Sequence, residues 1–278
     1  MPHWTVDQLR EHMAEALARL RGERPLVHHI ANAVTTQEVA NATLALGASP
    51  VMADAPEEVP QVTPRARALS LNLGTLSAPR AKAIHLAAQT ARAHGIPIVL
   101  DPTGVAMTSL RASLSLELLH EGITVTRGNV AEIAYVAGIQ AIARGVDAVG
   151  ATAPPQDVAR RCATRYGVVA AVTGAVDVIN DGTCSVRIAR GHPLLASVTG
   201  AGCIATALIA AFCATGASPL IASAAGLCAL DIAAERAAAQ AAGPGSFRVA
   251  LFDHLALLTP QDLRDVDGIA IRGQEDGV

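Results

Sequence analysis

The sequence is poor in aromatic residues and in lysine. Of its 278 residues only six are aromatic, and 20 of its 21 basic residues are arginine, so Lys82 is its single lysine. A phosphate-binding P-loop needs a Gly-Lys-Ser/Thr triplet, and the sequence holds none. A Schiff-base mechanism would rest on Lys82 alone, in a polar helix predicted over Ala78–His94. Any phosphate bound here must therefore be held by arginine, a metal ion or backbone N–H groups.

A strong net charge and paired cysteines are missing as well. The net charge is -3, without a basic run or tail, so we expect neither a nucleic-acid partner nor a membrane partner. The five cysteines form an odd set without a C-x-x-C pair, which argues against both a disulfide framework and a zinc site. The first 24 residues show no signal-peptide pattern. We therefore expect a cytoplasmic protein with reduced thiols.

Charged residues are also absent from Gly191–Leu230, a stretch of 40 residues. That length raises the question of a membrane span. Glycine and proline interrupt the stretch, however, and alanine, serine and threonine dominate it. We favour the interpretation that it forms two buried helices of small residues packed closely against a sheet.

What is present is a regular alternation of apolar strands and amphipathic helices. Gly22 is expected to end the first helix, and a capping box at Thr35–Glu38 to open the second. The alternation predicts βαβ units around a mainly parallel sheet. The predicted strands cover residues 26–30, 49–52, 68–73, 97–100, 123–126 and 168–172, and the predicted helices residues 6–21, 35–46, 79–94, 113–120, 130–137 and 155–166.

The pattern changes after Thr173. Residues 176–180 and 184–189, joined by the turn Asn180-Asp181-Gly182, are typical of a hairpin. Helices are predicted over 202–215, 219–242 and 247–258. The fold class is therefore α/β, with a mainly parallel central sheet, flanking helices and an appended hairpin. With 51% apolar and 16% charged residues and no linker or composition break, we expect a single domain over residues 1–278.

Polar side chains follow several predicted strands at the point where each strand ends. They are Asn32, Asp101, Arg127 with Asn129, and Thr173. Ligands of open α/β sheets bind outside the carboxyl ends of the strands. Each residue alone could be a turn or cap residue, but together they predict a ligand site at this edge.

The sharpest local motif is the glycine turn Val198–Cys203, followed by an apolar helix. Unpaired N–H groups at such a helix start form an anion site. Gly200, Gly202 and Ala205 also match G-x-G-x-x-A, but the dinucleotide fingerprint needs a following strand and an acid, and the next acid, Asp231, lies in a predicted helix. Close helix packing remains the plainer alternative.

A second motif is Arg127–Glu132, in which Asn129 and Glu132 lie three residues apart at a helix start. A carboxylate and an amide on one face suit Mg²⁺, which prefers oxygen ligands and often keeps waters. The same spacing is typical of an N-cap asparagine with a first-turn glutamate. The spacing alone leaves both interpretations open.

Taken in order, these segments resemble hydroxyethylthiazole kinase, a thiamine-pathway family of the ribokinase-like superfamily. The most specific motifs are LGASPVM (46–52), RGN-x-x-E (127–132) and VTGAGC (198–203), and the likeness runs collinearly along most of the chain. The resemblance implies a ribokinase-like three-layer αβα sandwich. It also implies ATP- and Mg²⁺-dependent phosphorylation of the primary hydroxyl of 4-methyl-5-(2-hydroxyethyl)thiazole, by a homotrimer whose thiazole pockets are shared between neighbouring subunits.

The resemblance further assigns site residues. They are Met52, Gly200 and Asn32 for the thiazole; Arg127 and Thr173 for ATP; Asp101 and Glu132 for the metal, directly or through water; and the turn Ala201, Gly202 and Cys203 for catalysis.

Cys203 stands where many ribokinase-like enzymes have a catalytic aspartate. A thiol has a pKa of about 8.5, which a helix start can lower, but a thiolate beside a triphosphate is electrostatically disfavoured. Our hypothesis is that Cys203 shapes the site while positioning and charge stabilisation carry the reaction. His29 and Ala31 depart from the family's HCITN pattern, so the thiazole contacts are expected to differ in detail. Thr103 replaces a usual apolar residue and is expected to matter less.

Two alternatives remain open, one within the superfamily and one of a different class of function. One is another superfamily enzyme, such as a hydroxymethylpyrimidine kinase or an ATP-dependent hydrate dehydratase, against which Cys203 and LGASPVM argue. The other is a non-catalytic nucleotide- or thiazole-binding protein. Against it stand Asp101, Asn129, Glu132 and the glycine turn, which binding alone would not need.

Overall fold

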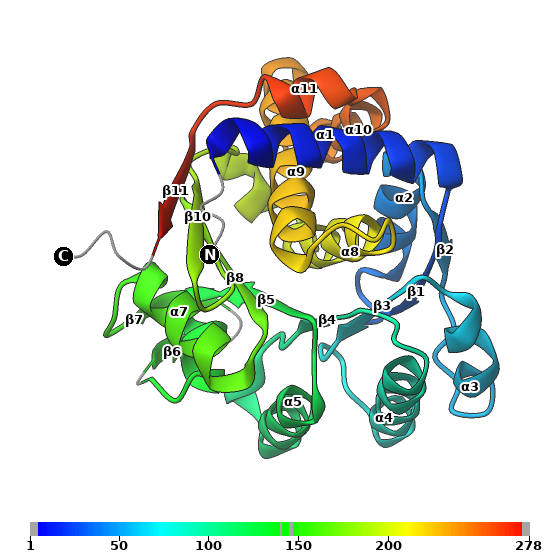
Figure 1. Ribbon diagram of the computed structural model, residues 1–278. Coiled ribbons are helices and arrows are strands. Elements are labelled where there is room, and N and C mark those ends of the chain that lie inside the picture. The colour runs from blue at the N-terminus through cyan, green and yellow to red at the C-terminus, as the bar shows by residue number, and fades with distance from the viewer. Residues whose placement is uncertain (1–4, 140, 145–146, 274–278) are drawn as a thin grey trace.

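A computed structural model describes residues 5–139, 141–144 and 147–273. Its central sheet has the strand order β11-β10-β9-β8-β5-β4-β3-β1-β2 (Figure 1). The strands β2, β1, β3, β4, β5 and β8 pair in parallel with one another. The strands β9, β10 and β11 are antiparallel to their neighbours. The bounds are β1 Leu26–Ile30, β2 Ser49–Val51, β3 Ala68–Asn72, β4 Ile98–Asp101, β5 Val125–Asn129, β8 Val169–Thr173, β9 Asp177–Asn180, β10 Cys184–Ile188 and β11 Ile269–Gly273.

Helices cover both faces of this sheet and give three layers (Figure 1). One layer holds α1 Val6–Glu23, α2 Thr36–Leu46, α8 Ala201–Cys213, α9 Pro219–Gln240, α10 Pro244–Leu257 and α11 Pro260–Arg264. The other holds α4 Ala78–Ala93, α5 Ser109–Glu121, α6 Val130–Val136 and α7 Pro155–Tyr166, with the short α3 Val59–Val62 beside α4.

The alternation of side chains along each strand explains why both faces are covered. In β4, Val99 belongs to the core beneath α8, whereas Ile98 and Leu100 belong to the core on the α4 face. Successive side chains of a strand point to opposite faces, so a strand that is apolar at every position needs a helix on each side. This arrangement confirms the predicted fold class.

Several elements were not predicted. The hairpin of β9 and β10 is confirmed, but β11 adds a third antiparallel strand to it. A separate two-stranded ribbon joins β6 Ala141–Arg144 to β7 Asp147–Ala151. The helices α3 and α11 were missed too, because each is only four or five residues long and shows no helical periodicity.

Several predicted helix boundaries are wrong, and α5 and α10 begin four and three residues before their predicted starts, at Ser109 and Pro244. Helix α1 continues through Gly22 and ends at Glu23, and its C-cap Arg24 takes the left-handed conformation at φ 47°. The capping box predicted at Thr35–Glu38 is wrong: α2 begins at Thr36, and the side chain of its N-cap, Thr35, accepts no capping hydrogen bond. Instead, Asn32 Oδ1 accepts from the backbone N–H groups of Val34 and Thr35. The loop before α2 is therefore organised by Asn32.

The uncharged stretch forms α8 and the first half of α9, as the small-residue interpretation expects. Gly226 of α9 faces Ile209 of α8, and a Cβ there would lie 2.7 Å from the Ile209 backbone nitrogen. Only a glycine permits this approach of two helices. In the part of the chain that the structure describes, no helix combines the length and the hydropathy of a membrane-spanning segment.

Candidate active site

The carboxyl ends of neighbouring strands bring together the polar residues singled out in the sequence. Asn32 follows β1, Asp101 ends β4, Arg127 lies within β5 and Thr173 ends β8. Strands β1, β3, β4, β5 and β8 are consecutive in the sheet. The start of α8 lies over the same edge, because Gly202 and Cys203 approach Arg127 and Asn32.

Asp101 is the centre of this group and is almost completely buried. Its Oδ1 accepts a hydrogen bond from Thr103 Oγ1 at 2.6 Å. Its Oδ2 accepts from Asn72 Nδ2 at 2.9 Å and from Thr206 Oγ1 at 3.0 Å. Both carboxylate oxygens are therefore fixed in direction before any ligand arrives. Thr103, expected to matter less, is one of the three groups that orient Asp101.

Arg127 supplies the cation of the site. Its Nη1 lies 3.7 Å from Asp101 Oδ2, and its Nη2 donates to Thr173 Oγ1. The side chain is 12% exposed, and its buried Nε has no hydrogen-bond partner among the described residues. A guanidinium held along one edge in this way keeps N–H donors for an anion such as a phosphate.

The glycine turn opens α8 with unpaired backbone donors. Gly200 has φ 94°, and the helix start from Ala201 receives no side-chain capping hydrogen bond from the described residues. A Cβ at Gly200 would lie 2.7 Å from Thr35 Cγ2, and one at Gly202 would lie 2.5 Å from Arg127 Nη1. Both glycines are therefore required by close contacts, and the exposed N–H groups and the helix dipole favour an anion here.

Cys203 lies at the same helix start and faces Asn32 and Asn72. Its Sγ accepts from Asn32 Nδ2 at 3.2 Å and from Asn72 Nδ2 at 3.4 Å. Burial, and next the charge of Asp101, raise the pKa of the Cys203 thiol. The helix start therefore does not produce a thiolate here.

Met52 lies on the same side as Cys203. Both side chains pack against a small apolar cluster of Ala31, Val39 and Ala207. Met52 directly follows the edge strand β2 and is half-buried. Of the predicted thiazole residues, Met52 thus packs in this apolar cluster beside Cys203, whose sulfur accepts from Asn32, whereas Gly200 lies against Thr35.

The motif around Glu132 is a complete capping box. Asn129 Oδ1 accepts from the Glu132 N–H, and Glu132 Oε2 accepts from the Asn129 N–H, each at 2.9 Å. Glu132 Oε1 also accepts from the N–H of Gly104 at 2.9 Å. The N-cap interpretation is therefore correct. It leaves room for the metal interpretation too, because each carboxylate oxygen has a further lone pair.

The electrostatics favour a cation near Glu132. Burial, and next the charge of Asp101, raise the pKa of Glu132 to about 7. The buried Asp101 and the partly buried Glu132 share one region, in which the positive charge of Arg127 lowers the Glu132 pKa. An oxygen-rich site with this excess of negative charge fits Mg²⁺, held directly or through water.

The sequence analysis missed two members of the site, Asn72 and Thr206. Asn72 ends β3 as Asp101 ends β4, so its position at a strand end was an available signal. Thr206 lies one turn after Gly202 in α8, and only the packing of α8 over the sheet brings it to Asp101.

The adjacent His28 and His29 are buried in the core. His28 Nδ1 lies 3.1 Å from Thr63 Oγ1, and His29 Nε2 lies 3.2 Å from Thr43 Oγ1. Burial lowers both pKa values, that of His29 to about 3. Both imidazoles are therefore neutral at physiological pH.

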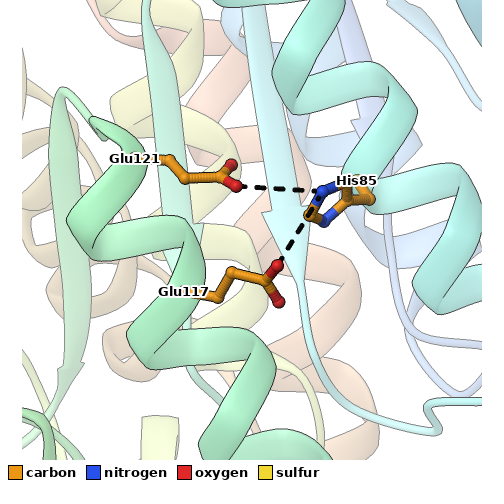
Figure 2. A group of neighbouring side chains, drawn as sticks. All are labelled: His85, Glu117 and Glu121. Carbon is orange, nitrogen blue, oxygen red and sulfur yellow. Dashed lines mark ion pairs between the residues drawn. The ribbon is translucent and has the colours of Figure 1, made fainter.

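A separate charged cluster lies between α4 and α5, away from these strand ends (Figure 2). His85 Nε2 is 3.9 Å from Glu117 Oε1 and 3.8 Å from Glu121 Oε1. Glu121 also pairs with Arg92 through its other oxygen. The side chains of the His85–Glu117–Glu121 cluster are 33% to 51% exposed. Its charges are thus compensated within a solvated ion-pair network.

Comparison with known proteins decides which family the fold and site represent. A sequence model described as the hydroxyethylthiazole kinase family matches residues 17–261. The chain belongs to the hydroxyethylthiazole kinase family. A hydroxyethylthiazole kinase of Methanoculleus marisnigri is 47% identical over 251 residues, which cover 90% of each chain. These matches confirm the resemblance read from LGASPVM, RGN-x-x-E and VTGAGC.

Solved structures agree with this membership. A hydroxyethylthiazole kinase structure from Pyrococcus horikoshii superposes with a TM-score of 0.85 and 38% identity, over 94% of this chain and 98% of the other. An ADP complex of Bacillus subtilis pyridoxal kinase gives a TM-score of 0.59 at 19% identity, over 77% and 92% of the two chains. The second likeness is one of fold alone. Within the hydroxyethylthiazole kinase family, this chain keeps the ribokinase-like architecture that its motifs imply.

Proposed function

We propose that this protein transfers the γ-phosphoryl group of ATP, in the presence of Mg²⁺, to the primary hydroxyl of 4-methyl-5-(2-hydroxyethyl)thiazole. The observation that carries the proposal is the convergence of Asp101, Arg127 and the uncapped start of α8 at one sheet edge. Membership of the kinase family supports it. A phosphorylated thiazole alcohol would feed thiamine biosynthesis or salvage.

Each part of the site has a role in this reaction. Arg127 and Thr173 bind the ATP phosphates, and the N–H groups of Ala201, Gly202 and Cys203 stabilise charge on the transferred group. Asp101 and Glu132 would hold Mg²⁺, which neutralises phosphate charge when bound. As the bond from the γ-phosphorus to the bridging oxygen of ADP breaks, the bond to the alcohol oxygen forms, and the hydroxyl proton is released, so that the products are the phosphomonoester, ADP and a proton.

The thiazole ring is assigned to the apolar region beside Cys203. Met52 packs there against Ala31, Val39 and Ala207, Asn32 donates to Cys203 at its border, and Gly200 opens the neighbouring helix start. Because the transition state of phosphoryl transfer is loose, holding the hydroxyl in line matters more than a strong base. The neutral thiol of Cys203 fits a shaping role.

The proposed assembly is a homotrimer in which neighbouring subunits complete the thiazole pocket. Met52 is half-buried next to the edge strand β2. Val34, just before α2, and Leu44, in the last turn of α2, are 63% and 52% exposed. Sedimentation analysis should give a trimer, and Leu44→Asp should dissociate it and weaken thiazole binding. A monomeric wild-type protein at micromolar concentration would remove this part of the proposal.

The decisive experiment incubates the protein with ATP, Mg²⁺ and the thiazole alcohol and follows the products by mass spectrometry. A phosphomonoester and thiazole-dependent ADP release are expected, and Arg127→Gln should lower kcat/KM by about 100-fold. The exposed Arg187 on β10 gives the control variant Arg187→Gln, which should be unaffected. Tight binding without turnover would favour a binding protein, and turnover of only hydroxymethylpyrimidine would favour the other kinase.

We also propose a cytoplasmic location. All five cysteines are free thiols in the structure, and Cys162, Cys213 and Cys228 are buried. Retention of full activity in reducing buffer is expected, since none of the proposed roles needs a disulfide.

A further inference from the structure

The side chain of Asn72 connects two parts of the active site that the proposed reaction must bring together. Asn72 ends β3 and is 4% exposed. Its Nδ2 donates to Asp101 Oδ2 at 2.9 Å and to Cys203 Sγ at 3.4 Å. Its Oδ1 accepts from Asn32 Nδ2 at 3.2 Å and from the Gly74 N–H at 2.9 Å. The amide thus uses both donors and both acceptor lone pairs.

The orientation of this amide is fixed by chemistry. A backbone N–H can only donate, so the atom facing Gly74 must be the Asn72 oxygen. The Asn72 nitrogen then faces a carboxylate and a thiol sulfur, both of which accept. A carboxylate in place of the amide would oppose Asp101, whereas an apolar side chain would leave buried groups without partners.

Asn72 differs from the other two donors to Asp101. Thr103 and Thr206 each donate to the carboxylate, but among the described residues Asn72 alone also bonds Cys203 and Asn32. The acceptor side of the site and the metal side are therefore joined through one buried amide. Removing it would leave Asp101 Oδ2 with the hydrogen bond from Thr206 and would break the direct link from the carboxylate to Cys203 and Asn32.

We propose that Asn72 is a positioning residue that holds the Asp101 carboxylate at a fixed place relative to Cys203 and Asn32, so that the acceptor hydroxyl and the phosphoryl group stay aligned. This inference rests on the proposed kinase function. Small displacements of reacting groups reduce rates steeply, and partners that orient a metal-binding carboxylate affect metal affinity or activity by about 10- to 100-fold.

Three variants separate positioning from folding. Asn72→Asp keeps the shape but replaces both donors with a charge, and Asn72→Ser is smaller and keeps one hydroxyl donor. Ser70→Ala is the matched control, because Ser70 lies two residues earlier on the same strand and is 6% exposed. Thermal unfolding measured beside activity identifies any variant that fails to fold.

Thr103 provides an independent pair of variants on the other carboxylate oxygen. Thr103→Val removes the hydroxyl at nearly constant volume, and Thr103→Ser restores it. If orientation of Asp101 limits the rate, valine should lower kcat by about 10-fold, and serine should recover most of that loss. A purely structural role would show no such recovery.

The test measures kcat, both KM values and Mn²⁺ binding in the presence of ADP by electron paramagnetic resonance. For Asn72→Asp and Asn72→Ser we expect kcat to fall by about 10- to 100-fold, KM for ATP to change by less than about threefold, and Mn²⁺ affinity to fall. Ser70→Ala should match wild type. Folded Asn72 variants with wild-type kcat and Mn²⁺ affinity would overturn the inference. A wild-type protein without thiazole-dependent turnover would instead overturn the proposed function.

Discussion

A Cβ atom at Gly202 would lie 2.5 Å from Nη1 of Arg127. The guanidinium occupies the space that any larger residue at the second position of α8 would need, and Thr173 and Asp101 hold it there. The glycine turn and the cation of the site therefore depend on each other. The sequence alone does not show this steric dependence, because the two residues are far apart along the chain.

Gly202→Ala tests that dependence. The added methyl must displace the Arg127 guanidinium, so we expect kcat/KM for ATP to fall by about 10- to 100-fold, while the helix itself is not weakened. The control is Gly22→Ala in α1, where a Cβ meets nothing within 4 Å. That variant should stabilise the protein by about 0.5–1 kcal/mol and leave the kinetics unchanged. Equal kinetics in the two variants would contradict the steric argument.

Cys203 is predicted to act as a neutral thiol. Because burial and Asp101 raise its pKa, alkylation by iodoacetamide at pH 7.5 should be slower than that of a free thiol in solution. Turnover by Cys203→Ser and Cys203→Ala should persist, since neither variant removes the helix-start donors, and Cys203→Asp completes the comparison. Abolished turnover in the serine and alanine variants, with a wild-type pH profile tracking a thiol, would show that Cys203 is the base.

Asp231 should make stability depend on pH. It is 5% exposed in α9, and its Oδ2 has no hydrogen-bond partner among the described residues. Burial, then Asp177 and Glu235, raise its pKa well above the ordinary value. The folded protein therefore keeps a proton that the unfolded chain releases near pH 4. The stability from this group is present below that pH and is lost as pH rises toward the folded pKa.

Asp231→Asn should remove this dependence. Above the unfolded pKa, the wild type loses up to about 1.4 kcal/mol per pH unit from such a group, and the neutral amide loses none. Burial raises the pKa of Asp177 to about 6. Asp177 therefore adds a similar loss of folding stability with rising pH, which ends near pH 6. Urea unfolding from pH 4 to 8 measures the slope, with the exposed Asp253→Asn as control. Parallel curves for wild type and Asp231→Asn would refute the assignment.

The His85–Glu117–Glu121 cluster is predicted to contribute little. Its side chains are at least one-third exposed, and exposed ion pairs contribute about 0–1 kcal/mol. His85→Ala should lower the free energy of unfolding by less than about 1 kcal/mol, and salt should reduce that difference further. Its kcat should equal that of wild type, because α4 and α5 place the cluster away from the strand ends. A large loss of activity in His85→Ala would contradict this prediction.

The sequence predicted the central sheet and much of the site because those signals are local. Asp101 and Thr173 end apolar runs, and the Gly200–Cys203 turn stands at the start of an apolar helix. The short strand β11 could not be predicted, since its pairing with β10 joins residues more than 80 positions apart. Thr206 was missed because its contact with Asp101 depends on how α8 crosses the sheet.

The contacts that form the site are long-range in sequence. Asn32 and Cys203 are 171 positions apart, and Asp101 and Thr206 are 105 apart. No fragment of the chain can assemble the site before the central strands have paired and α8 has docked on them, and such non-local closure slows folding. Occupancy of the site therefore reports on the whole folded molecule. A ligand that binds only there, at 100 times its Kd, would protect the entire sheet against unfolding by about 2.7 kcal/mol.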